Sequence, residues 1–400
     1  MIETIGTIFT YAIVYSLAIL LVSSADKTIS IHRKKWKVSF AVIFLAFFSS
    51  LRDIEVGTDT VNTIVQYFDS AVKYNSIYTL FSSELSGSTI VFFLIAKFIM
   101  AIGLGYKTFL FCMTLLILIP VAVVAYMRRE NTPMAATMMF FLFLYFQLSF
   151  NWIRQSIAAS FLILSVVLFI GDKKKSSIII ALISILFHSS ALLGLMLFIV
   201  AWFSSKSKSK LVRGFLVFIT VLFAILIMTS WKMIALFMIN QGILPASYIG
   251  YVNVFSGMHG SSFQGWFNVG LRTYGEYILR VGIFIVPFIS VRHSHYNMRL
   301  ANEENKGQEF ALFKMCGFLS ILIYSAGLFG LHTAYINRVT YFLDFSNIVY
   351  LGFTCNINKK HSKFVVPFSQ VATFVIAFVY NIWLYYILGW HETVPFSFSF

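Results

Sequence analysis

Four arginines lie at or inside the ends of long apolar segments of this chain: Arg52, Arg154, Arg272 and Arg338. A cation at membrane depth costs several kcal/mol unless it is paired or hydrated, so these positions indicate a site that binds an anion. Guanidinium groups bind phosphate oxygens through two parallel hydrogen bonds and stay charged when they are buried. We therefore expect the arginines to bind a phosphate or diphosphate that is attached to a lipid.

Other polar residues accompany these arginines at helical spacing. Asn151 and Arg154 share one face of a helix. Arg272, Glu276 and Arg280 follow one another at intervals of four residues and form a stripe with a net charge of +1. The alternative is an internal ladder of salt bridges that only holds helices together, and the sequence gives both interpretations equal weight.

Two further groups are candidates for chemistry. Arg338, Tyr341 and Asp344 repeat every three residues, so Asp344 either pairs with Arg338 or lies deeper in a cavity. His188 stands alone in an apolar segment, which is typical of a histidine with a structural hydrogen bond. Cationic neighbours would lower the pKa of this histidine, and a neutral imidazole could then serve as a general base.

The segment GTDT, residues 57–60, supplies a second candidate base. Gly57 permits a tight turn and Asp59 carries a carboxylate. The sequence has neither an HExxH motif nor a cluster of carboxylates with the spacing of metal ligands. Fixed cations can stabilise the negative charge of a departing diphosphate without help, so we expect neither a metal nor a cofactor.

The composition places these residues in a membrane protein. Hydrophobic residues make up 59% of the chain, charged residues only 11%, and 45 of its 400 residues are Phe. Apolar segments of roughly 17 to 25 residues recur along its length, and each can cross about 30 Å of hydrocarbon as a helix. The sequence predicts an all-α polytopic membrane protein, a single transmembrane domain over residues 1–400 with about 11–13 membrane helices, some short or re-entrant.

The basic residues predict the orientation. The chain carries a net charge of +15, and 20 of its 30 Lys and Arg fall in short segments at 27–37, 128–129, 173–175, 206–213, 292–306 and 359–363. By the positive-inside rule these segments are cytoplasmic and contact lipid headgroups. Nucleic acid is therefore not an expected partner.

The apolar segments between these loops predict the elements that position the polar residues. We expect helices at 4–22, 133–150, 152–170, 211–229, 270–291, 310–328, 340–355 and 364–388. Segment 176–203 has lysines at both ends, so it should form a hairpin that turns at the sequence FHSSA. Residues 60–81 and 89–102 fit helices in the membrane interface. Outer loops are expected near 52–87, 231–269 and 330–338.

This topology brings the unusual polar residues to one side of the membrane. The predicted outer group contains Arg52, Asp53, Asp59, Asn151, Arg154, Gln155, His188, Arg272, His332, Asn337 and Arg338. Because the orientation was derived from the lysine-rich loops alone, the convergence is independent support for one extracytoplasmic site.

Four motifs occur in a fixed order between residues 52 and 342: RDIEVGTDT, NWIRQSIAAS, FHSSAL and INRVTYF. Together they resemble the EpsG and Wzy-type polysaccharide polymerases of bacteria. The resemblance marks Arg52, Gly57, Asp59, Asn151, Arg154, Gln155, His188, Ser190 and Arg338 as functional residues. Many members of this family carry an aromatic residue after the aspartate of the first motif, where this chain has Thr60.

The resemblance implies a metal-independent glycosyltransferase of GT-C-like architecture in the bacterial cytoplasmic (inner) membrane, with its active site facing the periplasm. Such an enzyme joins undecaprenyl pyrophosphate-linked oligosaccharide repeats into O-antigen or capsular polysaccharide. Lipid-linked glycans are then both donor and acceptor, and a chain-length regulator and a flippase are the implied protein partners, besides membrane lipids.

The expected division of roles follows from these patterns. Arg154 and Arg338, with Arg52 or Arg272, would hold the pyrophosphate, while His188 or Asp59 would remove the acceptor proton. The supporting residues would be Gly57, Asn151, Gln155, Ser190, Glu276, Arg280, Tyr341 and Asp344. Two other functions stay open, an O-antigen ligase that transfers finished polymer and a flippase that performs no chemistry.

Overall fold

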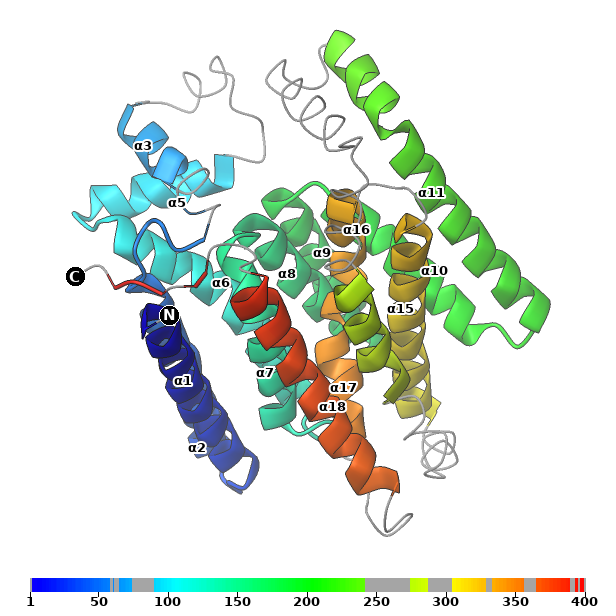
Figure 1. Ribbon diagram of the computed structural model, residues 1–400, viewed down its shortest axis with the longest axis horizontal. Helices are drawn as coiled ribbons and strands as arrows, with labels where there is room; N and C mark the ends of the chain where they lie inside the picture. The colour runs from blue at the N-terminus through cyan, green and yellow to red at the C-terminus, as the bar shows by residue number, and fades with distance from the viewer. Residues whose placement is uncertain are drawn as a thin grey trace.

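The computed structural model describes residues 2–57, 60, 65–73, 90–241, 274–286, 304–328, 333–355, 365–388, 393–394 and 396–398. In these residues the protein is all-α (Figure 1), apart from an isolated antiparallel β-bridge between Arg52 and Phe398. Within the described part of the chain, four helices are long and apolar enough to cross a membrane, at Thr4–Asp26, Tyr106–Met127, Ile153–Ile170 and Gln370–Ile387. The predicted fold class, an all-α polytopic membrane protein, is therefore confirmed.

The first half of the chain contributes these helices: α1 (Ile2–Asp26), α2 (Ile31–Ser50), α3 (Gln66–Lys73), α5 (Ile90–Ala101), α6 (Tyr106–Met127), α7 (Met134–Phe141), α8 (Ile153–Ile170) and α9 (Lys174–Phe187). The hairpin α1–α2 packs on α6, α6 packs on α8, and α8 packs along α9. Helix α8 is the most enclosed of the four long apolar helices, so its polar residues face protein.

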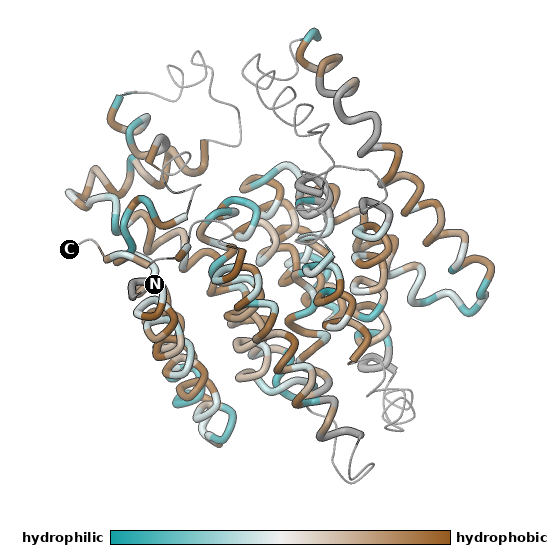
Figure 2. Tube along the Cα trace, in the orientation of Figure 1, coloured by the Kyte–Doolittle hydropathy of each residue, from teal (hydrophilic) through white to brown (hydrophobic). Residues whose placement is uncertain are grey.

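The second half adds α10 (Ala191–Lys206), α11 (Lys210–Asn240), a helix at 274–286, α15 (Glu304–Leu328), α16 (Thr333–Phe345), α17 (Asn347–Cys355) and α18 (Val365–Asn381). Helix α16 packs between α15, α10 and α8, while α11 packs on α10 and α15. Apolar residues cover the middle of the helices and hydrophilic residues gather near many of their ends (Figure 2), as lipid requires.

A glycine allows α8, α10 and α16 to approach closely. A Cβ atom on Gly194 of α10 would lie 2.6 Å from Cγ of Phe342 on α16 and 2.9 Å from Cδ2 of Leu162 on α8. Real side chains do not approach so closely, so only glycine fits between these helices. The contact fixes α16 against α8, the two helices that carry Arg338 and Arg154.

The predicted hairpin is confirmed. Helix α9 ends at Phe187 and α10 begins at Ala191, so the chain turns at His188–Ser190. The helix expected at 152–170 is α8, and the one expected at 364–388 is α18 followed by a π-helical segment, Ile382–Ile387. The helix expected at 133–150 changes type along its length, from α7 to π-helix (Leu142–Phe146) and then a 3₁₀ turn (Leu148–Phe150).

Helix ends differ from the prediction where polar residues were taken for loops. Helix α11 continues to Asn240, through the first ten residues of the outer loop expected at 231–269. Helix α16 begins at Thr333, so Arg338 lies inside a helix and not in the loop expected at 330–338. Helix α15 begins at Glu304, six residues before the expected start. Residues 242–269 and 330–332 of the two expected outer loops lie outside the described residues.

Candidate functional site

The turn between α9 and α10 fixes the imidazole of His188. The backbone N–H of Ser190 donates a hydrogen bond to Nδ1 of His188 over 3.2 Å, and Oγ of Ser190 lies 2.6 Å from the same nitrogen. The backbone N–H of His188 in turn donates to the carbonyl of Ser184, which closes α9. The turn therefore holds the ring in place, and His188 makes the structural hydrogen bond that is typical of a lone histidine in an apolar segment.

Two arginines act on this histidine. Burial, and then the positive charges of Arg154 and Arg338, lower the pKa of His188 from its usual 6.5 to about 3. The imidazole is consequently neutral at physiological pH. The same effect places both guanidinium groups within electrostatic reach of the ring, so the structure brings together three predicted site residues from α8, α16 and the α9–α10 turn. We call His188, Arg154 and Arg338 the arginine site.

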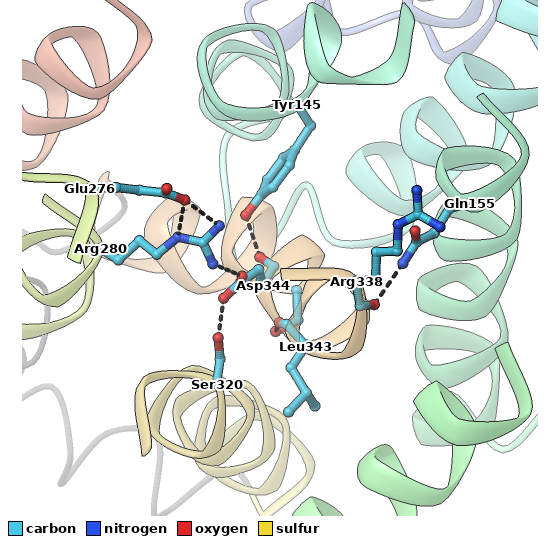
Figure 3. Close-up of polar contacts among 9 residues, drawn as sticks. Tyr145, Gln155, Glu276, Arg280, Ser320, Arg338, Leu343 and Asp344 are labelled. Atoms are coloured by element: carbon cyan, nitrogen blue, oxygen red, sulfur yellow. Dashed lines mark hydrogen bonds and ion pairs between the residues drawn. The ribbon is translucent and has the colours of Figure 1, made fainter. Parts of the chain in front are cut away.

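Polar contacts lock α16 to α8 beside the arginine site. The side-chain amide of Gln155 donates to the backbone carbonyl of Arg338 over 2.6 Å (Figure 3). One turn along, Oγ of Ser156 and the hydroxyl of Tyr341 are 2.8 Å apart. Gln155 is buried, whereas the side chain of Arg338 is exposed. The buried pair positions the backbone of α16, which leaves the guanidinium of Arg338 open to a ligand.

The first motif packs against the residues that precede α8. Gly57 has a φ of +92°, and a Cβ atom there would lie 3.0 Å from the carbonyl oxygen of Phe150 and 3.3 Å from Oδ1 of Asn151. The predicted tight turn at Gly57 is therefore present, and only glycine fits it without strain. Thr60 is fully buried, and its hydroxyl bonds the carbonyl of Val56 at 3.1 Å, so it presents no surface for a sugar.

Arg52 differs from the other arginines of the predicted site. It is only 1% exposed, its Nη1 donates to the carbonyl of Ser49 over 2.9 Å and to the hydroxyl of the same residue, and its guanidinium stacks 4.3 Å from the ring centre of Phe150. These contacts join the end of α2 to the entrance of α8. The guanidinium of Arg52, predicted to bind pyrophosphate, is thus buried against protein.

The stripe that contains Glu276 and Arg280 forms the expected salt bridge and extends it. Nη2 of Arg280 lies 2.8 Å from Oε1 of Glu276, and its Nη1 pairs with the carboxylate of Asp344 (Figure 3). Ser320 donates to the other oxygen of Asp344, and the ring of Tyr324 lies under the guanidinium. Of the two alternatives for Asp344, the deeper position is the observed one, because its partner is Arg280 and not Arg338.

Some predicted site residues cannot be located. Asp59 and Arg272 lie outside the described residues, and so does His332. For the located residues, the structure brings Arg154, His188 and Arg338 together. The sequence-predicted supports around this site are Gly57, Asn151, Gln155, Ser190 and Tyr341. Glu276, Arg280 and Asp344 form a separate cluster on the other side of α16.

The sequence did not predict three residues that contact the site residues, Phe150, Tyr145 and Ser320. Phe150 stacks on Arg52, and Tyr145 donates its hydroxyl to the carbonyl of Asp344 from the π-helical segment. Ser320 was overlooked in the apolar run of α15. Phe150 had one signal, its place directly before the second motif, whereas a π-helical segment has no reliable signature in a single sequence.

Comparison with models of protein families identifies the family of this chain. The model described as EpsG family matches residues 35–398, which is most of the chain. No curated protein matches the chain, and no solved structure matches it. The resemblance stated from the four motifs is thereby confirmed at the level of the family. The GT-C-like architecture stays a prediction.

Proposed function

The chain belongs to the EpsG family, and from this premise we propose that it is a glycosyltransferase that polymerises a polysaccharide from oligosaccharide repeats linked to undecaprenyl diphosphate. The observation that carries the proposal is the arginine site, in which Arg154 of α8 and Arg338 of α16 both act electrostatically on the neutral His188 of the α9–α10 turn. We place this site at the outer face of the bacterial cytoplasmic membrane, and the product is O-antigen or capsular polysaccharide.

The reaction needs a site that orients the acceptor hydroxyl, accepts its proton and stabilises the departing diphosphate. A hydroxyl oxygen of the acceptor repeat forms a bond to the anomeric carbon of the donor sugar, while the bond from that carbon to the diphosphate oxygen breaks. The electron pair leaves with the diphosphate, and the hydroxyl proton passes to a base, for which the sequence offers His188 and Asp59. The positive charges of Arg154 and Arg338 stabilise the departing diphosphate, whose charge grows in the transition state.

The exposure of the arginines supports a division of labour. Arg338 is exposed and Arg154 is half-buried, so both can meet a lipid-linked anion that arrives from the bilayer surface. Arg52 is buried and stacks on Phe150, and its role in our proposal is to position the turn at Gly57 and Asn151. Arg272 stays a sequence-based candidate for the pyrophosphate.

The surface glycans of a strain that lacks the gene test this function. We expect a single capped repeat on the surface, and long chains only when the wild-type gene is returned. Arg154→Ala should fail to restore them at an unchanged protein level. Arg129→Ala is the matched control, because Arg129 is half-buried but donates to the carbonyl of Tyr126 in the loop that precedes α7. Long polymer left on the lipid carrier would instead indicate a ligase, and loss of all surface repeats would indicate a flippase.

A further inference from the structure

Hydrogen bonding fixes which nitrogen of His188 carries the proton. The backbone N–H of Ser190, 3.2 Å from Nδ1, can only donate, so Nδ1 must offer its lone pair. The hydroxyl of Ser190, 2.6 Å from the same atom, then also has to donate to it. Nδ1 is therefore unprotonated in this turn.

The ring as a whole is neutral, so one proton remains to be placed. Burial and the charges of Arg154 and Arg338 disfavour the imidazolium form. A neutral imidazole carries a single proton, and with Nδ1 unprotonated that proton is on Nε2. No hydrogen bond joins Nε2 to another described residue, so its N–H is left for a ligand.

This assignment conflicts with the role of a base. A general base needs a lone pair that faces the acceptor hydroxyl. The lone pair of Nδ1 is directed into its own turn at Ser190, and Nε2 already holds a proton. His188 can donate a hydrogen bond to a substrate, but it cannot accept a proton from one without first losing the geometry of the turn.

We propose that His188 is a neutral hydrogen-bond donor, through Nε2–H, to the lipid-linked diphosphate, and that it is not the base of the reaction. The two guanidinium groups beside it make an anionic oxygen the fitting acceptor. A donor placed on the acceptor hydroxyl would weaken that nucleophile, whereas a donor on the diphosphate gains strength as negative charge develops there. Asp59 is then the remaining sequence candidate for the base. The identity of the anion rests on the proposed function, while the tautomer does not.

The tautomer is measured directly by ¹⁵N NMR on the full chain labelled at histidine, in lipid nanodiscs at pH 7. The signal missing from His188→Gln identifies His188 among the eight histidines. We expect a neutral ring with its proton on Nε2. A ring protonated on Nδ1, or on both nitrogens, would overturn the proposal, whatever the protein turns out to catalyse.

The role is tested with two substitutions and lipid-linked repeats extracted from the deletion strain. Glutamine places an amide N–H near the position of Nε2 but supplies no base, so His188→Gln should keep its rate of polymer formation within about tenfold of wild type. His188→Ala removes the donor and should lose about 10²-fold or more. Equal loss in both variants would mean that His188 is the base, and no loss in either would mean that it contributes nothing; each result overturns the proposal.

Controls separate this test from a failure of the proposed function. His32→Gln alters an exposed histidine in the first turn of α2, which accepts a hydrogen bond from Nε1 of Trp36 over 2.9 Å, so it should behave as wild type. Thermal unfolding of each variant in detergent identifies any that fails to fold, and if His188→Ala does, His188→Asn replaces it, because the shorter amide supplies no donor at the position of Nε2. If the wild-type protein extends no repeats, the proposed function is wrong, and the NMR result still decides the tautomer.

Discussion

Arg280, on the helix at 274–286, and Arg338, on α16, lie on opposite sides of α16 (Figure 3) and have opposite surroundings. Arg280 pairs with two carboxylates, Glu276 and Asp344, and stacks on Tyr324. Arg338 is exposed, and no carboxylate of a described residue lies within ion-pair distance of it. A cation whose charge is already matched holds helices together, whereas a cation without a carboxylate can still bind a substrate anion. The difference separates structural arginines from candidate ligand-binding ones.

The largest expected effect comes from the open arginine. Arg338→Ala should reduce polymer formation at least about 10²-fold, because a fixed positive charge next to the diphosphate is lost. Arg338→Lys should recover only part of the activity, since an ammonium group cannot form the two parallel hydrogen bonds of a guanidinium. Product formation from lipid-linked repeats measures both. If Arg338→Ala unfolds the protein but leaves the rate per folded molecule unchanged, Arg338 is a structural arginine like Arg280.

The matched arginine should show the reverse pattern. Arg280→Ala leaves Glu276 and Asp344 without their cation, and removal of one partner of a buried ion pair costs about 3–5 kcal/mol. Thermal unfolding in detergent measures this loss. Arg213→Ala, at an exposed arginine that donates to the carbonyl of Ser207, is the control and should leave stability unchanged. A stable but inactive Arg280→Ala protein would move Arg280 into the binding site.

A smaller effect is expected at the turn that supports the arginine site. Gly57→Ala combines a φ of +92° with a contact of 3.0 Å to the carbonyl of Phe150, so it should cost about 2 kcal/mol and displace Asn151. Gly103→Ala is the matched control, because Gly103 has a φ of +75° but no atom within 4 Å of its added Cβ. Its backbone strain should cost stability without lowering activity. Equal activity loss in both variants would remove Gly57 from the site.

The smallest expected effect concerns pH. His188 has an unfolded pKa near 6.5 and a folded pKa of about 3, so the unfolded chain binds a proton first as the pH falls. Stability due to this residue is complete above pH 6.5 and should decrease by about 1 kcal/mol between pH 6.5 and 5.5. Unfolding of wild type and His188→Gln across this range measures the difference. Identical slopes would show that His188 is not held neutral.

Elements set by composition could be predicted from the sequence. The hairpin that turns at His188 and helix α8 follow from the positions of lysines and apolar runs, and both are present. The membrane thickness predicted that the helix starting near residue 211 would end near residue 229. Helix α11 instead continues to Asn240, because no Gly or Pro interrupts the chain between residues 215 and 241. Residues 333–338 were expected in a loop, yet no helix breaker interrupts them and they form the first turns of α16.

The site was predictable only in part, for a physical reason. Spacing along one helix identifies neighbours three or four residues apart, so it gave Glu276 and Arg280. The partner of Asp344 is Arg280, which lies 64 positions away on another helix. In the same way, nothing in the sequence distinguished Arg52 from Arg338, because their exposure depends on Phe150 and on the packing of α2.

The most direct test of the central claim uses purified protein and lipid-linked repeats extracted from the deletion strain. Wild-type protein should convert them into a ladder of longer glycans and release undecaprenyl diphosphate, while Arg154→Ala, folded equally well, should produce neither. A wild-type protein that forms no ladder, or an Arg154→Ala protein that forms the same ladder, would contradict the account.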